Sequence, residues 1–167
     1  MAAAAEKKWS VPDFEQGTLV AVSAHVRRRI LLAVVPNLEP RFRRILDGCE
    51  LEFVHTLVDA QQALRSDKYD MIVVGVLFDE SRMFDLLRFV RTEETHRTTP
   101  IVCVRSQLAI SSRAILESLE IAVKALSANA FLDLQNFPDD ADGNARLRRI
   151  LDKLMEIDGD MQSGLKR

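Results

Sequence analysis

One apolar run constrains the fold of this 167-residue chain more than any other feature. It extends from Tyr69 to Gly75 with the sequence Tyr-Asp-Met-Ile-Val-Val-Gly, in which β-branched residues follow one another without polar alternation. Such a run is typical of a strand that is buried on both faces of a parallel sheet. Because stretches with helical spacing of apolar residues lie on either side of it, we interpret it as the central strand of an α/β domain.

Four further short segments are predicted to be strands: Ile30–Val35, Leu51–Thr56, Ile101–Val104 and Ala130–Leu132. Apolar residues at helical spacing predict five helices between and after the strands. Their inward-facing residues are expected to be Phe42, Ile45 and Leu46; Ala60, Ala63 and Leu64; Met83, Leu86, Leu87 and Val90; Ile115, Leu119, Val123 and Leu126; and Leu147, Ile150, Leu151 and Leu154. Strands and helices that alternate over short links predict a doubly wound, five-stranded parallel sheet with helices on both faces.

Residues that favour helix starts precede each predicted helix. We expect these starts at Asn37, with Pro40 in the first turn, at Asp59, at the turn Phe78–Ser81, at Ser111 or Ser112, and at Asn144.

The chain is predicted to divide into an N-terminal extension at 1–28, one domain at 29–157 and a C-terminal tail at 158–167. A compact domain of about 150 residues buries roughly 70% of the surface of its unfolded chain, so no disulfide or metal is needed to stabilise it. Trp9 and Phe14 in the extension either fold back onto the domain or anchor a second chain, because exposed aromatic side chains are costly.

Two segments just before the first predicted strand leave alternatives open. Thr18–Ala24, with the sequence Thr-Leu-Val-Ala-Val-Ser-Ala, fits either an extra strand or the first turns of a helix. Arg27–Arg29 fits a solvated approach to the strand or a nucleic-acid patch. The formal net charge of -2 and the lack of a basic recognition helix favour the first, so no direct nucleic-acid partner is expected.

Composition excludes several classes of protein. The two cysteines, Cys49 and Cys103, form no CxxC pair, so a disulfide framework or a zinc site is not expected and a reducing cytoplasm fits best. No stretch approaches the ~18 apolar residues of a membrane span, and Met1–Ala5 is too short for the apolar part of a signal peptide. No GxGxxG, GxxxxGK[ST] or GxSxG motif occurs, so neither a cofactor nor an enzymatic activity is expected.

The order of the segments carries a resemblance to a known family. The helix start Asp59–Leu64 (Asp-Ala-Gln-Gln-Ala-Leu), the run that ends in Gly75 and the segment Pro100–Val104 together resemble the response-regulator receiver domain over about residues 29–157. The resemblance implies a flavodoxin-like (βα)5 fold. In that family an aspartate at the end of the third strand accepts a phosphoryl group, with Mg²⁺ held by oxygen ligands.

The functional positions of that family are altered here. The resemblance implies an acidic pair after the first strand, an acceptor aspartate after the third, a hydroxyl after the fourth and a lysine after the fifth. The matching residues are Val35 and Pro36 or their neighbours, Gly75, Arg105 and Leu134. None of them can play the family's role, so the resemblance implies a degenerate pocket without a phosphoacceptor, a catalytic residue or a metal.

The leading functional hypothesis is therefore a non-phosphorylatable receiver-like signalling module that acts by protein–protein interaction. Its partner would be a protein of a signalling pathway, and a homodimer is possible. By analogy with the family, the contact surface would include the fourth helix, the fifth strand and the last helix, with Ile121, Met155 and Ile157 as candidate contacts.

Two alternatives remain. Arg105 could anchor an anion in a small-ligand sensor, or its side chain could simply point into solvent. Asp79 or Glu80 could replace the lost acceptor in an atypical phosphotransfer receiver, or both could act in helix capping.

Overall fold

The computed structural model describes residues 27–106 and 112–163, with side chains described as far as residue 157. Its strands are β1 (Arg29–Ala33), β2 (Glu50–Val54), β3 (Met71–Gly75), β4 (Ile101–Arg105) and β5 (Ala130–Asp133). Its helices are α1 (Glu39–Ile45), α2 (Leu57–Ser66), α3 (Met83–Thr92), α4 (Arg113–Ala125) and α5 (Ala141–Ser163), with short 3-10 helices η1 (Pro36–Leu38), η2 (Glu94–His96) and η3 (Leu134–Asn136).

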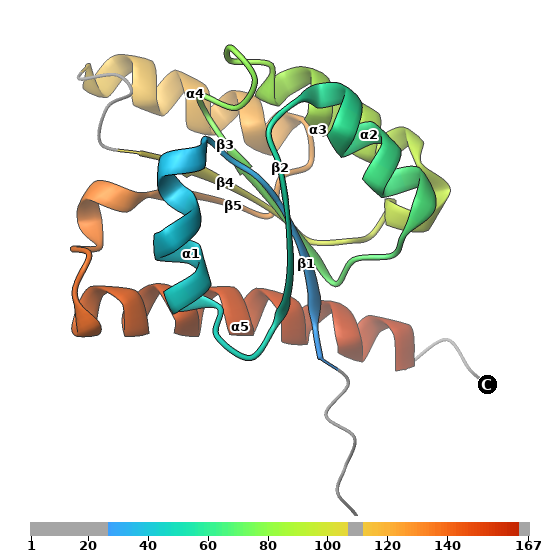
Figure 1. Ribbon diagram of the computed structural model, residues 1–167. Coiled ribbons are helices and arrows are strands. Elements are labelled where there is room, and N and C mark those ends of the chain that lie inside the picture. Colours follow the sequence, from blue (N-terminus) through green and yellow to red (C-terminus); the bar gives the residue numbers. More distant parts are fainter. Residues whose placement is uncertain (1–26, 107–111, 164–167) are drawn as a thin grey trace, which may run out of the picture.

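The five strands form one parallel sheet in the order β2-β1-β3-β4-β5. Helices α1 and α5 cover one face, and α2, α3 and α4 cover the other (Figure 1). The predicted doubly wound α/β fold is confirmed. The order of the strands reverses at β1 and β3, so the carboxyl ends of these two strands are the expected place for a ligand.

Strand β3 is the central strand, as predicted, and every residue in it is buried. Ile72 and Val74 point to the core under α2 and α3, whereas Met71 and Val73 point to the core under α1 and α5. Each fully buried aliphatic side chain of this kind stabilises a fold by roughly 1.5–3 kcal/mol. The sheet is therefore held from both faces, which explains the unbroken apolar sequence.

Helix α2 begins one turn earlier than predicted. Its N-cap is Thr56, whose hydroxyl oxygen accepts the Asp59 N–H at 3.1 Å and whose O–H donates to Asp59 Oδ2 at 2.7 Å. The prediction of Asp59 as the cap was wrong because Asp59 is the third residue of the helix, where a carboxylate completes a reciprocal capping pair.

Two other predicted caps were also wrong, because α1 begins after Leu38 and α5 begins before Asn144. Asn37 lies inside η1, although Pro40 does occupy the first turn of α1. Asn144 lies inside α5, and the carboxylate of Asp140 accepts the Gly143 N–H at 2.7 Å instead. Ser112 is the N-cap residue of α4 as predicted, while Ser111 lies outside the described residues.

Packing of the last two helices differs from the prediction at two positions. Ile115 was expected to face the core but is 52% exposed, whereas Val123 is fully buried. Met155 was expected to be a surface contact but is 3% exposed, and Ile157, at 65%, is exposed as expected. Helix α5 continues to Ser163, into the predicted tail.

The predictions for Trp9, Phe14 and Thr18–Ala24 fall outside the described residues. In the part of the chain that the structure describes, no helix is long and apolar enough to cross a bilayer.

Candidate functional site

The candidate site is the edge of the sheet where β1, β3, β4 and β5 end. Gly75 is the last residue of β3 and is buried. A β-carbon added there would lie 3.6 Å from the Cα of Val34 and 3.7 Å from its Cγ1, which is ordinary van der Waals contact. Its φ lies outside the left-handed region, so the backbone does not demand glycine at the position where the family resemblance places a phosphoacceptor.

The residue of the first strand that lies at this site is Val34, next to the predicted pair Val35 and Pro36. Ala33 pairs with Val74 in the sheet, so the next residue, Val34, lies against Gly75. Val34 is fully buried, Val35 is half-buried and Pro36 is exposed at the start of η1. The sequence left this position open among Val35, Pro36 and their neighbours, and the strand register selects Val34.

Arg105 lies at the end of β4 and is only 3% exposed. Its Nη1 lies 2.5 Å from Oδ2 of Asp133 and 3.4 Å from Oε1 of Gln135. The expectation that Arg105 points into solvent was therefore wrong. Arg105 and Asp133 face each other in the register of β4 and β5, so the sheet itself brings the two charges together.

Asp133 makes a second interaction in addition to this ion pair. Its Oδ1 accepts the Gln135 N–H at 3.0 Å and so caps η3. Both carboxylate oxygens are thus hydrogen-bonded within the chain. Sequence reasoning named Leu134 at this strand end but passed over the aspartate immediately before it.

Leu134 belongs to the core and not to a pocket. Only 1% of its surface is exposed, and it packs in the cluster that contains Val104 and Leu147. A lysine at this position would have to leave that cluster to reach a ligand. The structure therefore separates Leu134 from Arg105, which it was expected to accompany.

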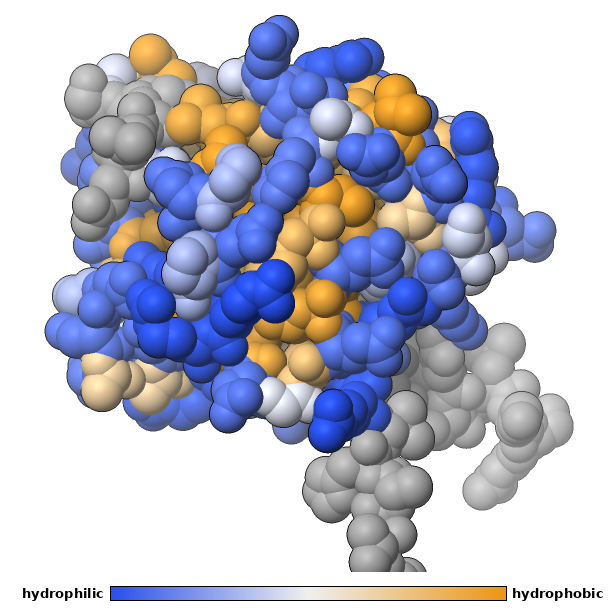
Figure 2. Space-filling view, viewed as in Figure 1, coloured by the Kyte–Doolittle hydropathy of each residue, from blue (hydrophilic) through white to orange (hydrophobic). Residues whose placement is uncertain are grey.

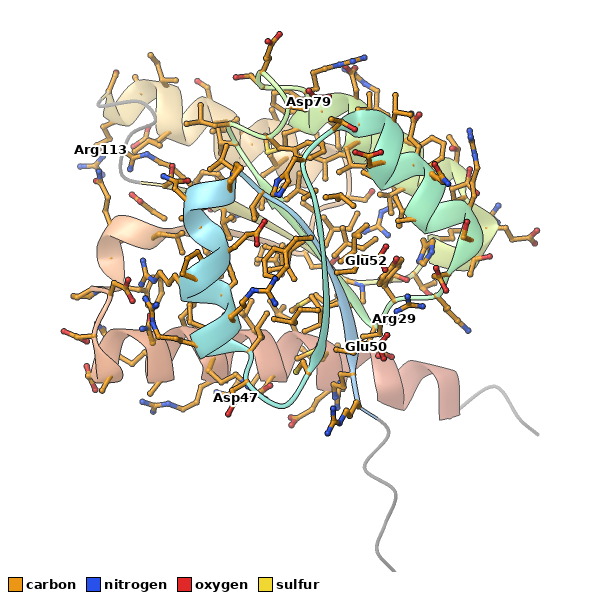
Figure 3. All side chains as sticks on the ribbon, viewed as in Figure 1. Arg29, Asp47, Glu50, Glu52, Asp79 and Arg113 are labelled. Atoms are coloured by element: carbon orange, nitrogen blue, oxygen red, sulfur yellow. The ribbon has the colours of Figure 1, made fainter. Side chains whose placement is uncertain are left out.

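Asp79 lies in the loop after β3, beside the start of α2 (Figure 3). Its Oδ2 accepts the Leu57 N–H at 2.8 Å, so it caps a helix other than the one that follows it. Asp79, Glu80 and Ser81 all have positive φ, of 42°, 55° and 71°, and α3 starts after Arg82 without a side-chain cap. The expectation that this turn caps the third helix was therefore wrong, and Asp79 caps α2 instead.

A histidine and a glutamate also meet at this edge of the sheet. His55 follows β2, and its Nε2 lies 2.7 Å from Oε1 of Glu39 at the start of α1. Its Nδ1 lies 2.9 Å from the carbonyl oxygen of Val34. The partners of His55 are distant from it in sequence, and the strand ends of a parallel sheet bring such residues together.

The oxygen donors at this edge do not fit a bound Mg²⁺. This hard cation needs carboxylate or carbonyl oxygens that converge with near-octahedral geometry. Val34 and Gly75 supply no side-chain oxygen, Asp79 caps α2, and Asp133 pairs with Arg105. Among residues 27–106 and 112–157, no group of three His, Cys, Asp or Glu side chains could hold a metal ion.

Solved structures with similar backbones decide the fold. A response regulator from Hahella chejuensis superposes with a TM-score of 0.64 at 23% identity, covering 78% of this chain and 97% of that one. The chain has the receiver fold.

Two further receiver structures agree. The signal receiver domain of a LuxO-type repressor protein from Vibrio parahaemolyticus has a TM-score of 0.67 at 16% identity. The match covers 85% of this chain and 100% of that one. The receiver domain of a sensor histidine kinase from Pseudomonas aeruginosa, with magnesium coordinated in its active-site cleft, has a TM-score of 0.56 at 21% identity, covering 78% of this chain and 98% of that one. No profile of a known protein family and no curated protein sequence matches the chain.

Proposed function

We propose that this chain is a receiver-fold signalling module that acts by association with another protein and is not phosphorylated at its strand-end pocket. The observation that carries the proposal is the buried ion pair between Arg105 and Asp133, beside a strand that ends in Gly75. Charge at this edge is balanced inside the chain, with no acceptor carboxylate on β3.

The ion pair also argues against the anion-sensor alternative. A guanidinium binds a phosphate or carboxylate strongly when its N–H groups face that anion. Here the Arg105 side chain is 3% exposed, and one of its nitrogens already donates to Asp133. An incoming anion would have to compete with a carboxylate that the sheet already holds against the guanidinium.

The displaced-acceptor alternative meets a similar difficulty. Asp79 is bound to the first amide of α2, and a carboxylate that caps a helix is stabilised as an anion by the amides and by the helix dipole. To serve as the acceptor at the strand ends, Asp79 would have to give up this hydrogen bond.

The surface of α4 supports action by association. Among the described residues, the exposed large hydrophobic side chains are Val58, Ile115, Ile121 and Ile157, so α4 contributes two of the four. Within α4 only Val123 is fully buried, and Leu119 packs partly against the core. A helix that is held by so few buried residues keeps apolar surface for a protein partner.

The experiment takes a second copy of the chain as the partner. Ile121→Asp is expected to weaken self-association in sedimentation velocity at unchanged circular dichroism. Val58→Asp is the matched control, because the two side chains are 70% and 67% exposed and lie on helices at different places of the same sheet face. Equal behaviour of the two variants, or a wild-type monomer at every concentration, would refute self-association through α4.

A further inference from the structure

Among the described residues, strand β2 has no neighbour on one side. It is the terminal strand of the described sheet and pairs there only with β1, where the Glu50 N–H donates to the Arg28 carbonyl at 2.9 Å. Both main-chain groups of a residue in a parallel strand point to the same side. The N–H and C=O groups of Leu51 and Phe53 therefore point away from β1, toward the open edge.

This edge is apolar as well as unpaired. Cys49, Leu51 and Phe53 are half-buried and pack only in part against the core under α1 and α5. Figure 2 shows hydrophobic side chains gathered on this face over β2, in the space between α1 and α2. Exposed edge strands are usually protected by charged residues, especially lysine, by proline or by a covering segment. The charged residues of β2 are Glu50 and Glu52, and it has no lysine or proline.

The chain before β1 starts beside this edge. Because Arg28 accepts a hydrogen bond from Glu50, the approach to β1 lies next to the first residue of β2. The outer side of β2 is two strand spacings from β1, about 9.6 Å. Five Cα steps from Ala24 to Arg29 reach at most about 17 Å, so the link can pass the start of β2.

The length of the link from Ala24 to Arg29 also determines the direction in which an added strand can run. An antiparallel strand over 18–24 would end beside the start of β2, within reach of Arg29. A parallel strand would end at the far end of β2, about 16 Å further along, and the diagonal of about 19 Å would exceed the link. Only in the antiparallel arrangement can the link from Ala24 reach Arg29.

We propose that Thr18–Ala24 adds a sixth strand to the sheet, antiparallel to the open edge of β2. The segment is uncharged and rich in β-branched residues, with Val20 and Val22 on one side of an extended chain. Two copies joined through their β2 edges would instead bring Glu50 and Glu52 of both chains close together, and facing like charges are destabilising.

Amide hydrogen exchange by NMR on the full chain tests the proposal. The Leu51 and Phe53 amides are expected to exchange about tenfold or more slowly in the wild type than in the double variant Val20→Pro/Ala21→Pro. Proline at two successive positions removes an N–H that faces β2 in either register. The matched control Ala2→Pro/Ala3→Pro should behave as the wild type, and the Glu52 amide, which faces β1, should stay protected throughout.

Two results would overturn the proposal. One is fast exchange of the Leu51 and Phe53 amides in the wild type, at the rate of the double variant. The other is protection that rises with protein concentration and survives the two prolines, which would assign the edge to a second copy. Protection that is lost only in Val20→Pro/Ala21→Pro supports the sixth strand.

Discussion

Nη1 of Arg105 lies 2.5 Å from Oδ2 of Asp133, and the two residues are register partners at the ends of β4 and β5. Side chains of parallel strands that face each other point to the same side of the sheet, so the backbone holds the pair together. The pair is also largely shielded from solvent, because the side chains of Arg105 and Asp133 are 3% and 20% exposed. This ion pair therefore neutralises the strand-end edge from within.

Removing one member of the pair should be costly. Asp133→Leu leaves the Arg105 guanidinium buried without its main counter-charge, and we expect a loss of about 3 kcal/mol in the free energy of unfolding. The double variant Arg105→Met/Asp133→Leu should lose clearly less than the sum of the single variants. Urea unfolding measures all three, and additive losses would contradict a direct interaction.

Gly75 should tolerate a side chain that Gly143 cannot. At Gly75 an added methyl makes ordinary contacts near 3.6 Å, so Gly75→Ala should change stability by less than about 1 kcal/mol. At Gly143 the same methyl would overlap the carbonyl of Pro138 and lie 2.8 Å from its nitrogen, so Gly143→Ala should cost about 1–3 kcal/mol. Thermal unfolding of both variants compares them, and a larger loss at Gly75 would contradict the described packing.

Asp79 should stabilise α2 from outside that helix. Asp79→Ala removes the carboxylate that accepts the Leu57 N–H, and loss of a capping interaction costs about 1 kcal/mol. Glu80→Ala is the control, because the neighbouring residue has a similar backbone, with φ of 55°, and makes no such contact in the described structure. Urea unfolding should separate the two variants; equal losses would mean that the loop, and not the carboxylate, is what matters.

The only tyrosine, Tyr69, gives a pH-dependent test at the opposite end of the sheet. Its O–H donates to Oε2 of Glu52 at 2.6 Å, and Glu52 also pairs with Arg29 (Figure 3). Burial and then this hydrogen bond raise the pKa of Tyr69 above its ordinary value of 10. The unfolded chain ionises near pH 10 and the folded chain does not, so this contribution to stability is complete below pH 10 and is lost as pH rises further.

The absorbance of tyrosinate during alkaline titration measures this directly. In the wild type it should appear above pH 10, together with unfolding seen by circular dichroism. In Glu52→Gln it should appear at lower pH. Ionisation of Tyr69 near pH 10 in a protein that is still folded would contradict the described environment.

The fold was predictable because the three inner strands β1, β3 and β4 are buried on both faces and therefore apolar over most of their length. Helix starts were less predictable, since several polar residues compete for each one. Thr56 and Asp59 form a Thr-x-x-Asp pattern that indicates a reciprocal cap, and attention to Asp59 alone missed it. Helix α2 therefore begins where the sequence signal was present but misinterpreted.

The arrangement of side chains at the candidate site was only partly predictable from the sequence. Gly75 and Arg105 were identified from spacing, and the strand order then implies that Arg105 faces Asp133. The contact from Asp79 to the α2 amide could not be inferred, because it depends on a loop with positive φ. Such contacts arise from the path of the chain in space, and local sequence patterns do not record them.

The central claim is that the strand-end pocket accepts no phosphoryl group, and the intact mass of the full chain after incubation with acetyl phosphate and Mg²⁺ tests it most directly. A functional receiver domain treated in parallel provides the positive control. We predict no phosphoryl adduct on this chain while the control gains one. A stoichiometric adduct that hydroxylamine removes would contradict the account, and its loss in Asp79→Ala would identify the carboxylate that had replaced the missing acceptor.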